Sequence, residues 1–103
     1  MPITPMFVVT VEFEIAPAHL DAFRAAMSEQ ARQSLAREAD CHQFDISYDS
    51  ERPACCFLYE KYTDAPAFDS HLASDHFLTF NALVTPWVVS KIVRTWALDP
   101  ADS

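Results

Sequence analysis

Three side chains in the second half of the chain have the chemistry needed to move protons. Glu60 stands near the end of an apolar run, and His71 and His76 follow it within two short segments. A histidine changes its charge near neutral pH, and a neighbouring carboxylate can orient it or share its proton. If the fold brings the three together, we expect acid–base chemistry, with His71 as the base, Glu60 as its orienting partner and His76 beside them.

Each of these residues also has a purely structural interpretation. His71 follows Phe68 by three positions and Ala67 by four, so it shares their helix face and points inward, where a hydrogen-bonded core histidine would also lie. His76 falls in the first turn of the next expected helix, which is commonly exposed. A buried Glu60 needs a partner, and that partner could be the backbone or an arginine across a dimer instead of a histidine or a substrate hydroxyl.

Aromatic residues and possible metal ligands allow two interpretations as well. The aromatic residues expected to line a substrate pocket also suit an ordinary core; they are Phe44, Tyr62, Phe68, Phe80 and Trp87. Glu60, His71 and His76 could in principle supply the three ligands that a catalytic zinc requires. We predict no metal at this site. The remaining histidines, His19 and His42, have no partner pattern and are expected at the surface.

Periodicity predicts the elements that position these residues. Residues 6–15, 43–49 and 54–62 alternate as strands, and 87–96 forms the last strand. Apolar residues recur at helical spacing from Pro17 to about 40. Asp64 is expected to cap a short helix, and Ser74 to cap a second that ends near Val84.

The resulting order, β-α-β-β-α-β, predicts an α+β ferredoxin-like fold, with helices on one face of a four-stranded antiparallel sheet. The third strand is apolar or aromatic on both faces, although a sheet face in water should be more polar. We therefore expect a second copy of the chain to cover the open face, in a homodimer.

Composition limits the function further. The 103 residues suit one domain, 1–103, with its core at about 6–97 and a tail at 98–103. The net charge of −8 argues against nucleic acid and anionic membranes as partners. The chain has no glycine, which excludes the glycine-dependent phosphate loops of nucleotide and dinucleotide sites. No membrane span or signal peptide is apparent, so we expect a cytoplasmic protein.

Three runs of the sequence resemble a known family: Cys41 to Asp45, Leu58 to Asp64 and His71 to Phe77. Together they resemble the antibiotic biosynthesis monooxygenases, a family of dimeric α+β barrels that includes small quinol monooxygenases. The similarity extends from Phe7 to about Val93. The family usually has Pro-Gly before the cysteine of the second strand, where this chain has Ala39 and Asp40.

The resemblance implies a cofactor-independent monooxygenase acting on a small electron-rich aromatic, such as a quinol. The spacing of Phe44, Glu60, His71 and His76 is also similar to that of the family member that processes phosphorylated autoinducer-2. That similarity implies an isomerase or tautomerase of a small phosphorylated ketone. A non-catalytic ligand-binding module is a third alternative. Haem is disfavoured, because the haem-degrading branch places its ligating histidine where this chain has Asn81.

Overall fold

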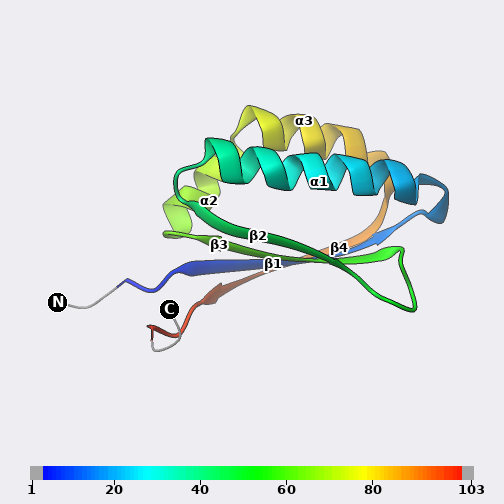
Figure 1. Cartoon of the computed structure of the whole chain (residues 1–103). Coiled ribbons are helices and arrows are strands. Elements are labelled where there is room, and N and C mark those ends of the chain that lie inside the picture. Colours follow the sequence, from blue (N-terminus) through cyan, green and yellow to red (C-terminus); the bar gives the residue numbers. More distant parts are fainter. Residues whose placement is uncertain (1–3, 101–103) are drawn as a thin grey trace.

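A computed structural model describes residues 4–100 of the chain, and Figure 1 shows its arrangement. The elements, in chain order, are β1 (Phe7–Ile15), α1 (Leu20–Arg37), β2 (Cys41–Tyr48), β3 (Cys55–Tyr62), α2 (Ala65–Leu72), α3 (Asp75–Val84) and β4 (Val88–Ala97). Short 3-10 turns at Pro17–His19 and Thr85–Trp87 lead into α1 and β4. The expected α+β ferredoxin-like fold is confirmed, with the second helical segment divided into α2 and α3.

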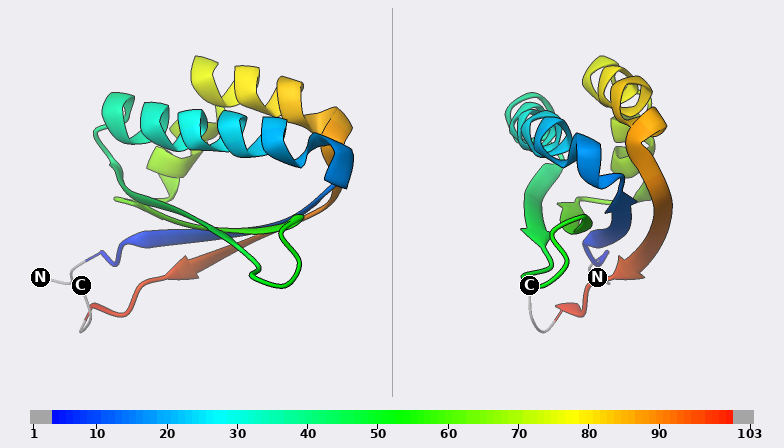
Figure 2. Two further views of the ribbon diagram at one scale, coloured as in Figure 1. Left: turned by 45° about the vertical axis from the view of Figure 1, so that its right-hand side comes forward. Right: turned by 90° about the vertical axis from the view of Figure 1, so that its right-hand side faces the viewer.

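The four strands form one antiparallel sheet in the order β2-β3-β1-β4. Strand β1 is central and pairs with β3 on one side and β4 on the other. All the helices lie on the same face of this sheet, and α1 and α3 run side by side across it (Figure 2). No helix of the described part of the chain covers the opposite face.

The core lies between the sheet and these helices. The alternation of β1 turns Val9, Val11 and Phe13 toward the helices, where all three are buried. Helix α1 contributes Phe23 and α3 contributes Phe80, whose rings pack together at 6.4 Å between centroids. Burying one such side chain stabilises the fold by about 1.5–3 kcal/mol relative to leaving it exposed.

The two caps expected around α2 and α3 are present. The Asp64 carboxylate accepts a hydrogen bond from the Ala67 backbone N–H at 2.9 Å, and Pro66 occupies the first turn of α2. The Ser74 hydroxyl accepts from the Phe77 N–H at 3.2 Å and donates to the His71 carbonyl at 2.6 Å. Ser74 therefore ends one helix and starts the next, which fixes how His71 and His76 are placed relative to each other.

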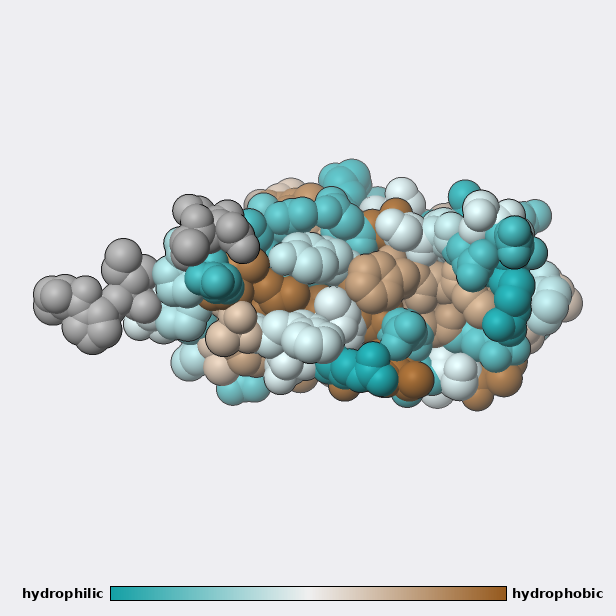
Figure 3. Space-filling model, turned by 90° about the horizontal axis from the view of Figure 1, so that it is seen from below, coloured by the Kyte–Doolittle hydropathy of each residue, from teal (hydrophilic) through white to brown (hydrophobic). Residues whose placement is uncertain are grey.

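The open sheet face carries several large apolar side chains among polar ones (Figure 3). Phe57 is 42% exposed, Ile92 47% and Trp96 50%. Within the described residues, β4 pairs only with β1, and this edge position leaves it exposed along nearly its whole length. None of the described helices is both long and apolar enough to span a membrane. The last three residues of the predicted tail, 101–103, lie outside the described residues.

Candidate active site

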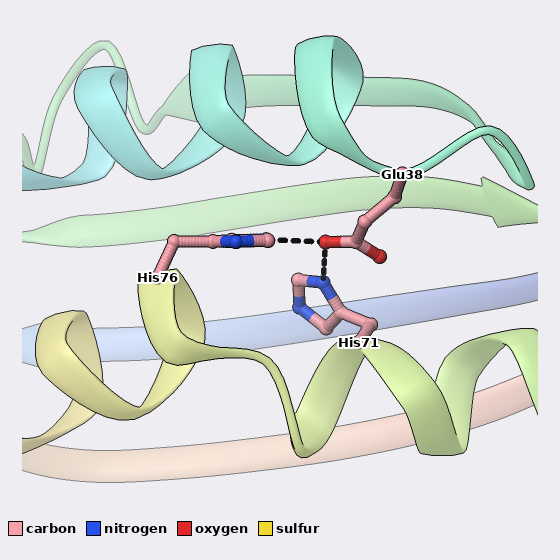
Figure 4. Close-up of side chains that lie close together, drawn as sticks. All are labelled: Glu38, His71 and His76. Atoms are coloured by element: carbon pink, nitrogen blue, oxygen red, sulfur yellow. Dashed lines mark hydrogen bonds and ion pairs between the residues drawn. The ribbon is translucent and has the colours of Figure 1, made fainter.

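Two histidines converge on a single carboxylate oxygen. His71 Nδ1 lies 2.8 Å from Glu38 Oε2, and His76 Nε2 lies 2.5 Å from the same oxygen. Figure 4 shows both rings directed at Glu38, one from the end of α2 and the other from the start of α3. The expected convergence of His71 and His76 on an acid is therefore present. The acid is Glu38, so the prediction that Glu60 orients His71 is wrong.

Glu38 reaches this position because it is the residue at which α1 stops. Its backbone is extended (φ −111°, ψ 105°), and its N–H still bonds the Ser34 carbonyl. The chain turns there toward β2, and the carboxylate descends between α2 and α3 (Figure 4). The Glu38 side chain is only 15% exposed, so its bonds to the imidazoles form largely out of water.

His71 is buried among aromatic rings. It is 3% exposed, and Phe68 stacks on it with an interplanar angle of 15°. Burial lowers the pKa of His71 below its ordinary value, and the hydrogen bond and charge of Glu38 oppose that shift. If Nδ1 donates its hydrogen to Glu38, Nε2 is the ring nitrogen left with a free lone pair. A neutral imidazole held in one tautomer by a carboxylate is a suitable general base.

His76 is more enclosed than the sequence suggested. Its side chain is 7% exposed, whereas a residue in the first turn of a helix is often exposed. Its Nε2 also lies 3.2 Å from the Ser74 hydroxyl. The other ring nitrogen, Nδ1, is buried and has no hydrogen-bond partner among the described residues. His76 therefore shares Glu38 with His71 and brings a second imidazole to the same carboxylate.

Glu60 belongs to a separate pair. It is 3% exposed, and the Tyr62 hydroxyl donates a hydrogen bond to its Oε1 at 2.5 Å. Burial raises the pKa of Glu60 to about 7; the Tyr62 bond lowers it, the Glu38 charge raises it and the Lys91 charge lowers it. A carboxyl group with a pKa near neutrality can gain or lose a proton at physiological pH.

Glu60 and His71 line the same cavity between the sheet and the helices. The space that whole water molecules can occupy there is about 40 Å³, and the empty space out to the open mouth is about 400 Å³. The full lining is Val11, Phe13, Met27, Gln30, Phe44, Leu58, Glu60, Phe68, His71, Leu72, Phe77, Phe80, Lys91 and Val93. Most of this wall is apolar, which suits a small hydrophobic ligand with a few polar groups.

The structure distributes the predicted aromatic wall unevenly. Phe44, Phe68 and Phe80 line the cavity as expected. Tyr62 is fully buried behind Glu60 and acts on the cavity through that residue, so its predicted direct contact with a substrate is corrected. Trp87 is also corrected, because it precedes β4 and stacks on His19 with centroids 5.4 Å apart, outside the cavity wall.

Glu38 is the site residue that sequence reasoning missed. It lies 33 residues before His71 in the chain, and no helical or strand period connects the two. The only signal in the sequence was an acidic residue at the point where the helical pattern gives way to the strand that begins at Cys41. An acid at such a junction is ordinarily exposed, and only the packing of α1 against α3 brings it inside.

Glu38, His71 and His76 also form the donor set of a possible metal site, with their ligand atoms within 4.8 Å of one another. Two ligands of a tetrahedral zinc, each bonded at about 2.0–2.1 Å, lie about 3.3 Å apart. The shared oxygen is closer than that to both nitrogens, at hydrogen-bonding distance. Metal-binding histidines also usually donate their second N–H to a partner, which His76 Nδ1 lacks among the described residues. The geometry favours a hydrogen-bonded triad over a metal site.

The chain resembles one known family and several solved structures. The antibiotic biosynthesis monooxygenase model matches residues 6–83. A candidate antibiotic biosynthesis monooxygenase from Nitrosomonas europaea superposes with a TM-score of 0.88 at 25% identity, covering 97% of each chain. A Mycobacterium tuberculosis protein gives 0.84 at 26% identity, covering 93% of this chain and 98% of its own. The comparison with curated proteins gave no match.

Proposed function

The chain belongs to the antibiotic biosynthesis monooxygenase family, and on that basis we propose that it oxidises a small quinol-type aromatic with O₂ and requires no bound cofactor. The observation that carries the proposal is the contact between His71 and Glu38 at the wall of an apolar cavity. An imidazole held in this way can remove a phenolic proton, and the resulting phenolate is electron-rich enough to reduce O₂. The substrate then supplies the electrons that a flavin or metal provides in other oxygenases.

The proposed reaction converts a quinol and O₂ into a hydroxyquinone and water. His71 takes a hydroxyl proton, and the phenolate passes one electron to O₂. The superoxide and the aryloxyl radical combine through a new carbon–oxygen bond, and the peroxide formed loses water. The quinol gives up four electrons in all and O₂ accepts four, so no external reductant is consumed.

Each polar group at the site has a distinct part in this proposal. Glu38 holds the tautomer of His71 and stabilises the imidazolium after proton transfer. His76, bonded to the same oxygen, shares the positive charge that develops across the triad. Glu60, with its pKa near 7, hydrogen-bonds a substrate hydroxyl and exchanges its proton. Phe44, Phe68 and Phe80 hold the ring and exclude water.

Access to the cavity requires side chains at its mouth to move. The space open to whole waters, about 40 Å³, is smaller than the roughly 150 Å³ of a cavity that holds benzene. Leu72 lines the mouth and is 38% exposed, so it can turn outward without breaking core packing. We place substrate entry there, beside Lys91 and Val93 of β4.

We further propose that the working form is a homodimer that covers the open sheet face. The strand register places Phe57 and Ile92 beside Glu12, and Trp96 beside Val8, on the face opposite the helices, where all three are exposed. Figure 3 shows apolar side chains gathered on that face. A permanent interface of this type buries more than about 2,000 Å² in total. Light scattering should give about twice the 11.6 kDa of the single chain, and a monomer at micromolar concentration contradicts the proposal.

The decisive experiment for the reaction is oxygen consumption by the purified protein with a panel of quinols, without added flavin, nicotinamide or metal. We expect one O₂ consumed for each quinol converted, with one atom of ¹⁸O₂ retained in the hydroxyquinone. The same two proton-handling groups would also suit the isomerisation of a phosphorylated ketone. Turnover of such a ketone under nitrogen, with no O₂ uptake on any quinol, would favour that second function.

A further inference from the structure

Gln30 is a buried residue to which the proposed reaction gives no part. It lies on the inner face of α1 and is 3% exposed. Neither its amide nitrogen nor its amide oxygen has a hydrogen-bond partner among the described residues. An unpaired buried amide destabilises a fold, and Met or Leu would fill the same space without that cost. The amide therefore requires a partner that residues 4–100 do not provide.

The surroundings of Gln30 indicate where that partner binds. Gln30 lines the central cavity together with Glu60 and His71. It also borders an open groove between α1 and α3, which includes Gln33 and His76. Both Gln30 amide atoms are shielded from solvent, so they do not lie on the exposed floor of that groove. The central cavity is the more enclosed of the two spaces and already holds the proton-handling groups.

The chemistry of the amide limits what it can recognise. A carboxamide is uncharged and presents a donor, Nε2–H, beside an acceptor, Oε1. It therefore matches a ligand with an acceptor and a donor on neighbouring atoms. Two hydroxyls on adjacent ring carbons meet this requirement, because one can donate to Oε1 while the oxygen of the other accepts from Nε2. Hydroxyls on opposite sides of a ring cannot both reach one amide.

We propose that Gln30 is a specificity-determining residue that selects aromatic substrates with two neighbouring ring oxygens, the catechol type, over para-quinols. This inference rests on the proposed function, since it names the substrate class of the same cavity. It adds a recognition element on α1 to the proton-handling groups that α2 and β3 provide in the same cavity. A catechol held by Gln30 would also supply the hydrogen bonds that both amide atoms otherwise lack.

Binding of two isomers under nitrogen tests the proposal without any reaction. Catechol and hydroquinone have the same atoms and differ only in where the second hydroxyl stands. We expect calorimetry to show catechol binding about 10-fold more tightly to the unaltered protein. Gln30→Met keeps the volume and removes both polar atoms, so it should reduce this preference to within about 2-fold without lowering the melting temperature. Gln33→Met, one turn away on the same helix, should keep it.

The outcomes separate this inference from the proposed reaction. A lowered melting temperature in Gln30→Met with the isomer preference intact would overturn the inference, because Gln30 would then be structural, with its amide satisfied by buried water. Equal binding of the two isomers to the unaltered protein, or binding of neither, would also overturn it. A catechol preference that depends on Gln30 but comes with no O₂ uptake would leave the inference standing and remove the monooxygenase proposal.

Discussion

Glu38 and Glu60 are both glutamates whose carboxyl groups are largely buried, but their surroundings differ. Glu38 stops a helix, keeps 15% of its side chain exposed and accepts from two imidazoles. Glu60 lies mid-strand, is 3% exposed and accepts a hydrogen bond from the neutral Tyr62 hydroxyl. Imidazoles can take up positive charge beside a carboxylate, whereas a phenol cannot. Burial therefore raises the pKa of Glu60 to about 7, because the hydrogen bond from the Tyr62 phenol offsets only part of the shift.

These different surroundings favour separate roles for the two acids. Glu38 is not among the residues that line the cavity, so in the proposed reaction it acts through His71 and His76. Glu60 lines the cavity, and its proton is available near neutral pH. In the proposed reaction one acid is a positioning residue and the other a proton exchanger, although both look alike in the sequence. The following experiments test that division, beginning with the largest expected effect.

Replacing the proposed base should cost the most activity. His71→Gln keeps bulk and some hydrogen bonding but cannot accept a proton near pH 7, so kcat should fall about 10²–10⁴-fold. The melting temperature should change little. The matched control is His42→Gln, since His42 is exposed on β2 and is hydrogen-bonded to the Thr63 hydroxyl at 2.7 Å. Full activity in His71→Gln would exclude it as the base and direct attention to His76.

Glu38→Gln should have the next largest effect. The new amide can present a donor to the two rings, which disturbs the tautomer of His71, and we expect a loss in kcat of about 10²-fold. The acid limb of the pH–rate profile should also move to lower pH, because Glu38 no longer raises the pKa of His71. Glu29→Gln, at an exposed position on the same helix, serves as the control. If Glu60→Gln moves that limb and Glu38→Gln does not, the division between the two acids is reversed.

Glu60→Gln should change stability in a pH-dependent way. Because the folded pKa is raised to about 7, the neutral form favours folding; this contribution is fully present below pH 4.5 and is lost as the pH rises through 7. Glutamine stays neutral, so the variant should be more stable than the unaltered protein at pH 8 by about 1–3 kcal/mol, and equally stable near pH 4. Denaturant unfolding at the two pH values measures this, with Glu51→Gln in the exposed β2–β3 loop as control. A variant less stable at pH 8 would contradict the assignment.

The smallest expected effect is that of metal removal. If Glu38, His71 and His76 are joined by hydrogen bonds, then dialysis against a chelator should leave the rate of quinol oxidation within about 2-fold. The rate is measured before dialysis, after it, and after adding back zinc, iron or manganese. Loss of activity that one of these metals restores would show that Glu38, His71 and His76 bind a metal, with Glu38 as one of its ligands.

The sequence by itself determined the secondary structure and which side chains point inward. The alternation of β1 and the caps at Asp64 and Ser74 are local features, set by side-chain period and by hydrogen bonds within a turn, and both are present in the structure. The inward direction of His71 follows in the same way from its spacing to Phe68. The same local reasoning placed Phe44, Phe68 and Phe80 in one core, because each lies on the apolar face of its element.

Only the tertiary structure decided which acid meets the histidines. Both Glu38 and Glu60 could be partners of His71, and the sequence favoured Glu60 because it is nearer to His71 in the chain. The packing of α1 beside α3 instead carries the end of α1 over the α2–α3 junction. Glu60, two residues before Tyr62 on the same face of β3, bonds the Tyr62 hydroxyl and lines the cavity. Trp87 was misplaced for the same reason, since its stacking partner His19 comes from the turn before α1, far away in the sequence. Contacts between distant segments depend on how whole elements pack, and no local period in the chain encodes them.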